Sequence, residues 1–156
     1  MIQRIISGGQ TGADQGGLYA GSMLGIETGG WACQGWVTED GPQRELLRGF
    51  GLVECRVAGY AARTEANVRL GDGTVIFYPH LMGQKITGGS YMTECVALAL
   101  EKPLLIIRLD INRNDEIDRF WTTFCNVQTL NVAGPRESRC VGIGDRVCQW
   151  LMEVLG

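Results

Sequence analysis

The residues of this chain best placed to do chemistry lie in one glycine-rich stretch, Ser7–Gly17. It follows a short apolar run, Ile2–Ile6, that predicts a buried strand, and it precedes a segment with helical spacing. A strand that enters a helix through such a turn leaves backbone N–H groups free to bind an anion at the helix N-terminus. Gly8, Gly9 and Gly12 would let the backbone approach a phosphate closely. The alternative is a tight turn that binds nothing.

Neither of the two common phosphate-loop sequences occurs in this stretch. The dinucleotide-binding pattern G-x-G-x-x-G fits no frame of it, and the Walker pattern G-x-x-x-x-G-K-[ST] needs a lysine that the stretch lacks. The loop is therefore a candidate anion site of another kind. Its predicted position, at the carboxyl end of a strand, is where ligands bind in open parallel sheets.

A second glycine-rich helix start lies midway along the chain. Gly88 and Gly89 precede Ser90, which, like Thr87, could cap the helix and donate to an anion. Two such starts in one small α/β domain indicate a phosphate-bearing ligand whose ends are both held by backbone groups. His80, in the same loop, is a candidate general base, although a lone histidine is more often structural.

Two further loops carry side chains that suit a planar, anionic ligand. Arg63 and Thr64 are predicted to open a helix, where they could meet a phosphate. The alternative there is a helix start with a solvated Arg63. Trp31 and Trp36 surround the end of a weaker predicted strand and could stack on a heterocycle.

The sequence gives little support for a metal site. Glu39 and Asp40 could hold a divalent cation, but an Asp-Gly turn with surface carboxylates is the simpler interpretation. The six cysteines form no C-x-x-C pair and the chain has one histidine, so the pattern of a zinc site is absent. Cys95 and Cys125 stand among apolar residues, which predicts small buried side chains. We predict no metal ligand and no catalytic residue.

Short apolar runs alternate with helical patterns along the whole chain. Strands are predicted at Ile2–Ser7, Thr28–Trp31, Leu52–Cys55, Thr74–Tyr78, Leu104–Leu109 and Val127–Val132. Helices are predicted at Asp14–Leu24, Pro42–Arg48, Arg63–Leu70, Ser90–Leu100, Asp115–Phe124 and Ser138–Leu155. This alternation predicts an α/β fold, a doubly wound and mainly parallel sheet with helices on both faces.

Helical spacing assigns a small-residue or apolar face to three of these helices. The faces are Gly17, Ala20, Gly21 and Leu24; Met92, Cys95, Val96 and Ala99; and Ile143, Val147, Trp150, Leu151 and Val154. The first face would let its helix sit close on the sheet. The other two are predicted to be buried against the core.

Composition narrows the class of protein. The 156 residues suit one domain spanning residues 1–156. A net charge of −3 argues against a nucleic-acid binder, which normally presents a basic face. No apolar run reaches about 18 residues, which argues against a membrane span. Unpaired thiols and the absence of a leader-like start predict a cytoplasmic protein.

A series of motifs in this order makes the chain resemble a known family. The motifs are Ser7-Gly8-Gly9-Gln10-Thr11-Gly12-Ala13-Asp14, Gly29-Gly30-Trp31, Glu39-Asp40-Gly41, Arg63-Thr64-Glu65-x-Asn67-Val68, Asp72-Gly73-Thr74 and Gly88-Gly89-Ser90-x-x-Thr93. Together they are similar to the molybdenum cofactor carrier-like family. That family is a branch of the Rossmann-like superfamily that includes lysine decarboxylase-like nucleotide phosphoribohydrolases. The matches span residues 1–105, and each motif alone is weak.

The resemblance implies a Rossmann-like sheet and a small anionic ligand, either the molybdenum cofactor (molybdopterin) or a nucleotide. The predicted cofactor-binding residues are Gly8, Gly9, Gln10, Thr11, Gly12, Asp14, Gly30, Arg63, Thr64, Gly88, Gly89, Ser90 and Thr93. One segment departs from the family, because Cys33-Gln34-Gly35-Trp36 replaces a Pro-Lys-Gly-Arg-like segment and lacks its two cations. We therefore expect a less charged or more weakly bound ligand. Cys33 is a candidate soft ligand for molybdenum, with an ordinary thiol as the alternative.

We accordingly expect a carrier or binding protein, with a phosphoribohydrolase-like enzyme or a nucleotide-sensing domain as alternatives. The hydrolases carry G-G-x-G-T-x-x-E, but this chain has Tyr91, Met92 and Cys95 at the last three fixed positions after Gly88. Glu94 is one residue out of register, which turns a helical side chain by about 100°. It would point away from a ligand unless the helix starts one residue late.

Assembly is predicted partly by analogy. Members of the wider superfamily commonly form dimers. Phe120, Trp121 and Trp150 exceed what so small a core must bury. We expect a homo-oligomer, a dimer or a tetramer, with closed symmetry.

Overall fold

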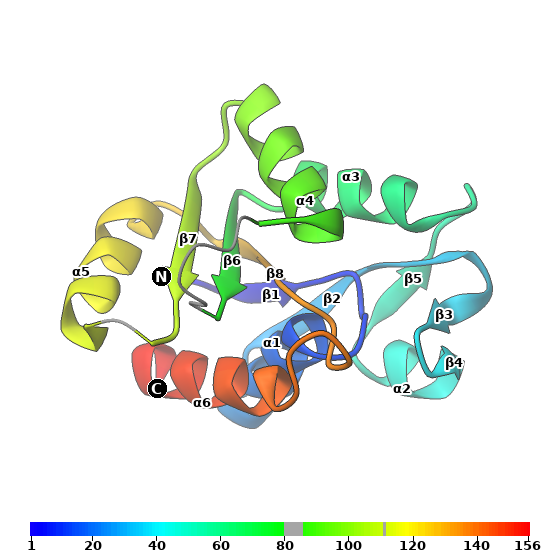
Figure 1. The fold of residues 1–156 in the computed structure, drawn as a ribbon, viewed down its shortest axis with the longest axis horizontal. Helices are drawn as coiled ribbons and strands as arrows, with labels where there is room; N and C mark the ends of the chain where they lie inside the picture. The colour runs from blue at the N-terminus through cyan, green and yellow to red at the C-terminus, as the bar shows by residue number, and fades with distance from the viewer. Residues whose placement is uncertain (80–85, 111) are drawn as a thin grey trace.

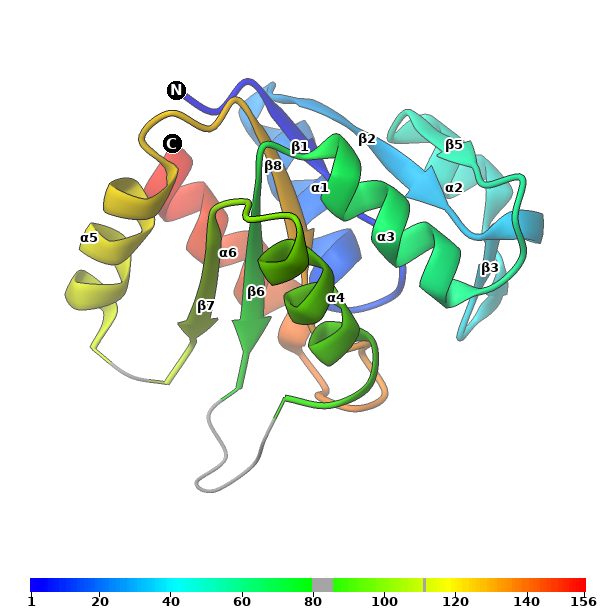
Figure 2. The same ribbon diagram turned by 90° about the horizontal axis from the view of Figure 1, so that it is seen from above.

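Six parallel strands form the central sheet in a computed structural model that describes residues 1–79, 86–110 and 112–156. The strands are β1 (Arg4–Ile6), β2 (Glu27–Ala32), β5 (Leu52–Glu54), β6 (Gly73–Tyr78), β7 (Leu104–Arg108) and β8 (Thr129–Ala133). They lie in the order β5-β2-β1-β8-β6-β7, and each neighbouring pair is parallel (Figure 2). Each predicted strand is present within two residues of its expected bounds.

Helices cover both faces of this sheet (Figure 1). One face carries α1 (Ala13–Leu24), α2 (Arg44–Gly49), α5 (Arg113–Phe124) and α6 (Ile143–Leu155), and the other carries α3 (Tyr60–Leu70) and α4 (Gly88–Ala99). The predicted doubly wound, Rossmann-like α/β fold is therefore confirmed. A short helical turn, η1 (Gln34–Trp36), and a two-stranded hairpin, β3 (Val37–Thr38) and β4 (Gly41–Pro42), were not predicted. In the described part of the chain, no helix is long and apolar enough to cross a bilayer.

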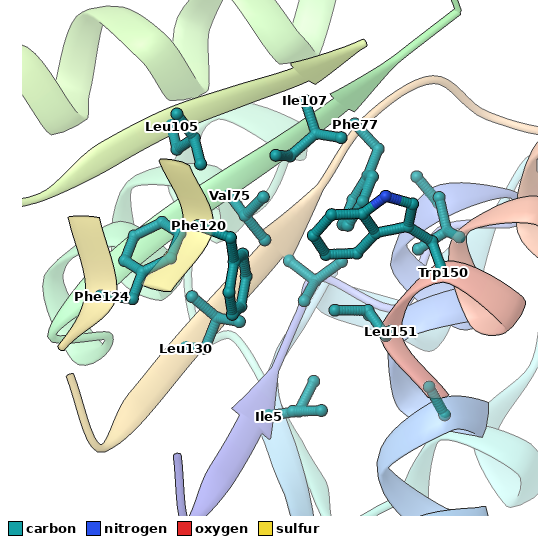
Figure 3. Close-up of a cluster of buried hydrophobic side chains, with 14 of the residues drawn as sticks. Ile5, Val75, Phe77, Leu105, Ile107, Phe120, Phe124, Leu130, Trp150 and Leu151 are labelled. Atoms are coloured by element: carbon teal, nitrogen blue, oxygen red, sulfur yellow. The ribbon is translucent and has the colours of Figure 1, made fainter. Parts of the chain in front are cut away.

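The larger core lies between the sheet and helices α1, α5 and α6. Phe77 and Phe120 each meet Trp150 edge to face, at ring-centroid distances of 5.2 and 5.3 Å (Figure 3). The apolar face predicted for α6 is confirmed, since its buried residues include Val147 and Trp150. The sequence analysis predicted that the core would not need to bury Phe120, Trp121 and Trp150. This was wrong for Phe120 and Trp150, which the core buries, whereas Trp121 is 39% exposed.

The small-residue face of α1 also packs as predicted. A Cβ atom on Gly17 would lie 2.7 Å from Val132 Cγ1, and one on Gly21 would lie 2.7 Å from Thr28 Cγ2. Gly16 extends this close packing to α6, because a Cβ atom there would lie 2.4 Å from Gly144 O. Glycine is thus what lets α1 lie directly on both the sheet and α6.

Three expectations about helices were wrong. The apolar face predicted for α4 is not buried, because the helix turns Ser90, Thr93 and Ala97 inward and leaves Cys95 exposed. These small inward side chains suit a helix that lies close to α3 and to the cavity described below. Cys125 is likewise exposed rather than buried, since it follows the end of α5 at the surface.

The starts of α3 and α6 also differ from expectation. α3 begins at Tyr60, three residues before the predicted start, so Arg63 lies on the body of the helix. α6 begins at Ile143 instead of Ser138. The reason is that Gly142 has φ +85° and the Glu137 carboxylate accepts hydrogen bonds from the N–H groups of Gly142 and Gly144, which ties residues 137–142 into a loop.

Candidate functional site

A cavity of about 660 Å³ opens at the carboxyl ends of β1, β8 and β6. Its wall comes from the loop after β1, the first half of α3, the start of α4, and the loop between β8 and α6. A volume of this size suits a small-molecule ligand. Nine of the predicted binding residues line it: Gly8, Gln10, Asp14, Arg63, Thr64, Gly88, Gly89, Ser90 and Thr93.

The loop after β1 is held by its own side chains. Ser7 Oγ donates to Asp14 O at 3.0 Å and accepts from Gly9 N at 3.2 Å. Gln10 N donates to Asp14 Oδ2 at 3.3 Å, while Gln10 Oε1 accepts from Thr11 N. Gln10 Nε2 is buried and has no hydrogen-bond partner among the described residues. Gln10 itself lines the cavity, so this unpaired donor belongs to a residue of its wall.

Arg63 forms the floor of the cavity together with Asp14. Its Nη1 lies 3.7 Å from Asp14 Oδ2 and donates to Gly8 O at 3.1 Å. The solvated Arg63 considered from the sequence is wrong, because the residue is only 9% exposed. Burial raises the pKa of Asp14 and outweighs the opposing effects of Arg63 and of backbone hydrogen bonds. The floor is therefore a buried ion pair whose acid holds its proton more tightly than usual.

Positive charge gathers on one side of the cavity around an aromatic ring. The guanidinium carbons of Arg63 and Arg136 lie 5.3 and 5.6 Å from the ring centroid of Tyr60. Arg139, three residues beyond Arg136, also lines the cavity. Two guanidinium groups held near one ring, with a third nearby, make this side a favourable place for an anion.

The start of α4 is more open than the loop after β1. Gly88 has φ +62°, and no heavy atom of the described residues would lie within 4 Å of a Cβ atom on Gly88 or Gly89. The predicted side-chain cap was wrong, because Thr87 occupies the N-cap position without a capping hydrogen bond and Ser90 lies inside the helix. Thr93 Oγ1 donates instead to Gly89 O at 2.9 Å. The backbone N–H groups of the first turn are thus left for another partner.

Four predicted residues do not line the cavity. Gly9 packs toward Leu47 and Leu52, and Gly12 lies against the backbone of residues 135–137. Thr11 Oγ1 donates to Glu39. Gly30 has φ +121°, and a Cβ atom there would lie 2.3 Å from Ser7 O. The structure gives each of these four a packing or bonding role within the protein.

Glu39 connects three parts of the chain through its carboxylate. Its carboxylate accepts hydrogen bonds from Thr11 Oγ1 and from both the backbone N and the side-chain Oγ of Ser138. Burial acts to raise the pKa of Glu39, but these hydrogen bonds prevail and the net shift is downward. No cluster of three metal-ligating side chains occurs among the described residues.

Other sequence candidates lie apart from the cavity. Trp31 and Trp36 do not line it, so the predicted stacking role finds no support. Cys33 is buried beyond its wall, and burial raises the pKa of its thiol. His80 lies outside the described residues.

The sequence analysis did not predict seven polar or aromatic residues that line the cavity. The missed polar and aromatic residues are Tyr60, Asn67, Tyr78, Asn131, Arg136, Arg139 and Cys140. A usable signal was present for Arg136, because Gly134-Pro135-Arg136 follows a predicted strand and therefore lies at its carboxyl end. The early start assigned to the last helix, at Ser138, placed Arg139 and Cys140 in a helix and not in this loop.

Comparisons with known proteins identify the family of this chain. Residues 5–155 match the family model described as the circularly permutated YpsA SLOG family. The chain belongs to this family. It is 38% identical to the crystal structure of a "Putative molybdenum carrier protein" from Syntrophus aciditrophicus SB, with a TM-score of 0.86. That match covers 98% of this chain and 94% of the other. A search of curated proteins finds no match.

Membership of this family confirms the family resemblance seen in the motifs. The match also extends past residue 105, where the quoted motifs end, and includes the loop that carries Arg136 and Arg139. The name of a molybdenum carrier belongs to the relative from Syntrophus aciditrophicus SB.

Proposed function

We propose that this protein is a binding protein of the molybdenum cofactor carrier kind, which holds a phosphate-bearing pterin or nucleotide in the cavity. The observation that carries the proposal is the gathering of Arg63, Arg136 and Arg139 with two glycine-rich helix starts around one space. Guanidinium groups recognise phosphate in a bidentate manner, and helix N-termini add backbone donors. The name given to the relative from Syntrophus aciditrophicus SB is consistent with this ligand class.

The rest of the wall suits the heterocyclic part of such a ligand. Gln10 Nε2 is a buried donor without a partner among the described residues, and a ring carbonyl or a phosphate oxygen would satisfy it. Asn131 adds an amide group, and the Tyr60 ring adds a flat apolar surface. Molybdopterin and purine nucleotides both combine a flat, hydrogen-bonding ring system with phosphate, so the donor set fits either.

The same wall favours binding over hydrolysis of a nucleotide. Asp14 is the one carboxylate among the described residues that line the cavity, and it is paired with Arg63. Glu94 does not line it. Cleavage of an N-glycosidic bond needs a carboxylate within hydrogen-bond reach of the sugar or of the attacking water. A binding or nucleotide-sensing role is therefore preferred to a phosphoribohydrolase.

The test combines identification of the ligand with one matched pair of variants. Mass spectrometry of small molecules released from the purified protein should find a pterin or a nucleotide. Calorimetric titration with AMP and ATP should then show binding that Arg136→Met weakens by about 10- to 100-fold, as expected for a lost charged hydrogen bond. Arg146→Met, on the exposed side of α6, is the control and should bind like the wild type.

Two outcomes would contradict this proposal. One is a purified protein that carries no such molecule and binds neither probe. The other is steady release of free base from AMP that disappears in Glu94→Gln while the fold is intact, which would establish a hydrolase.

We also propose a cytoplasmic homo-oligomer, most simply a dimer with two-fold symmetry. The support is indirect: Trp121, at 39% exposure, remains available for a contact between subunits. Light scattering at micromolar concentration that found only the 17.0 kDa single chain would contradict the oligomer.

A further inference from the structure

Two buried cysteines come side by side at the carboxyl ends of β2 and β5. The parallel register pairs Ala32 with Glu54, and Cys55 N donates to Ala32 O at 2.8 Å. The ladder therefore continues by one residue and sets Cys33 beside Cys55. The two thiols also interact electrostatically, since Cys33 is one cause of the raised pKa of Cys55.

Both side chains point to the same face of the sheet. Ala32 and Leu52 belong to the smaller core cluster beneath α1 and α2. Because side chains alternate along a strand, Cys33 and Cys55 point the opposite way, toward α3. Arg63, on α3, is the cation that acts electrostatically on both thiols.

The spacing of the two strands leaves room for an ion between the sulfurs. Neighbouring strands lie about 4.8 Å apart, so two thiolates on adjacent strands can reach one ion. Two metal–sulfur bonds of about 2.3 Å, the length of a zinc–thiolate bond, span about 4.6 Å when they are collinear. An ion held between two sulfurs therefore fits without moving either strand.

We propose that Cys33 and Cys55 form a two-coordinate site for a soft monovalent cation, of which Cu(I) is the representative. Thiolates select Cu(I), and Cu(I) accepts two ligands in a line. Zn²⁺ is disfavoured because it takes four ligands, and no cluster of three ligating side chains occurs in the described parts of the chain. This site is separate from the proposed ligand cavity, which neither cysteine lines.

Metal binding at this position must displace the thiol protons. Burial raises the pKa of both thiols, so without metal they are protonated near neutral pH. Binding forms two Cu–S bonds, breaks two S–H bonds and releases two protons, with no change in oxidation state. The product carries one negative charge; Arg63 favours a negative charge on Cys33, and Asp14, which is paired with Arg63, opposes it. Cys33 and Cys55 are 4% and 6% exposed, so an ion held between them would be largely shielded from water.

The experiment uses the full chain with its two exposed cysteines removed, as Cys95→Ser/Cys125→Ser, to suppress surface binding. The protein is titrated anaerobically with Cu(I) in competition with the chromophoric chelator bathocuproine disulfonate. We expect one equivalent bound, with X-ray absorption showing two sulfur neighbours. In this background, Cys33→Ala or Cys55→Ala should weaken binding by at least 100-fold. Cys148→Ala, which removes a half-buried thiol on α6, should leave it unchanged.

A second measurement on the parent protein covers the case in which a cysteine variant does not fold. Bound Cu(I) should protect Cys33 and Cys55 from alkylation by iodoacetamide in the presence of urea too dilute to unfold the protein. Peptide mass spectrometry measures the extent of alkylation at each cysteine. The inference would be overturned by protection of other cysteines, by three or more sulfur neighbours, or by equal Cu(I) affinity in a folded Cys33→Ala or Cys55→Ala variant.

Discussion

The loop before α1 and the loop before α4 both bring glycines to one cavity, yet they are built differently. In the first, a Cβ atom on Gly8 would lie 2.6 Å from Arg63 Nε, and one on Gly12 would lie 2.5 Å from Pro135 O. In the second, no described heavy atom would lie within 4 Å of a Cβ atom on Gly88 or Gly89. In the first loop, glycine is needed because other parts of the protein fill the space of a side chain. In the second loop, that space is open.

This difference assigns separate tasks to the two loops. The first is a fixed support, in which Asp14 and Arg63 are held by short-range contacts. The second is the side where a ligand can approach backbone directly. Replacing Gly9 with valine is therefore a perturbation of folding and not a test of binding, because the new side chain would meet Leu47 and Leu52. Three substitutions separate the two tasks.

The largest effect is expected for Gly12→Ala. Gly12 has φ +83° and packs against the backbone of Pro135 and Glu137, which cannot move aside as a flexible side chain can. Strain and overpacking together should lower the free energy of unfolding by about 4 kcal/mol. Urea denaturation measures this loss. Gly41→Ala is the matched control, because Gly41 has φ +87° but no described atom near its Cβ position, so it should lose only about 1–2 kcal/mol.

If both alanine variants lost the same stability, close packing would not be the reason for glycine at position 12.

A smaller loss, about 3 kcal/mol at pH 7, is expected for Arg63→Met, because it leaves the buried Asp14 carboxylate without its cation. Burial already raises the pKa of Asp14 in the folded state above that of an ordinary aspartate, and removal of Arg63 raises it further. Such a group contributes stability that is present at low pH and is lost as pH rises through its folded pKa. The deficit of the variant should therefore grow from pH 4 to pH 7 in urea denaturation.

Asp14→Asn in the Arg63→Met background should restore much of that stability at pH 7 and remove this added pH dependence. A deficit that is independent of pH would show that Arg63 acts through its packing over Gly8 and not through its charge.

The smallest change in stability is expected for Gly89→Ala, within about 0.5 kcal/mol of the wild type or slightly stabilising. Alanine favours helix over glycine, and no described atom opposes its methyl group. Its affinity for AMP or ATP, measured by calorimetry, should nevertheless fall. The added methyl group would occupy the space through which the ligand contacts the protein backbone. A stable variant with unchanged affinity would remove this loop from the binding site.

Hydrophobic periodicity was sufficient to predict the sheet and most helices. Strands such as β6 and β7 are continuous apolar runs, as expected for strands buried on both faces. The face of α4 could not be predicted in this way. Its inner side carries Ser90 and Thr93, which are polar because they face a cavity, so the apolar residues next to them gave a false core face.

The site was only half predictable for a related reason. Glycine patterns identify loops that approach other groups closely, but they do not say whether the other group is a ligand or the protein itself. Gly30 shows the second case, with Ser7 O and Asn67 Oδ1 occupying the space beside it. Arg139 lies in a loop that Gly142 and Glu137 fix where the sequence suggested a helix.

The position of β8 has a consequence for the order in which the molecule can assemble. β8 lies between β1 and β6, so Leu130 pairs with Ile5 on one side and Gly73 on the other. During synthesis, β5-β2-β1 and β6-β7 are two half-sheets with open edges until residues 129–133 emerge. Joining them needs contacts across more than 120 residues, which are slow to form. Because Arg136 and Arg139 follow β8 directly, the cavity is completed only in that last joining step.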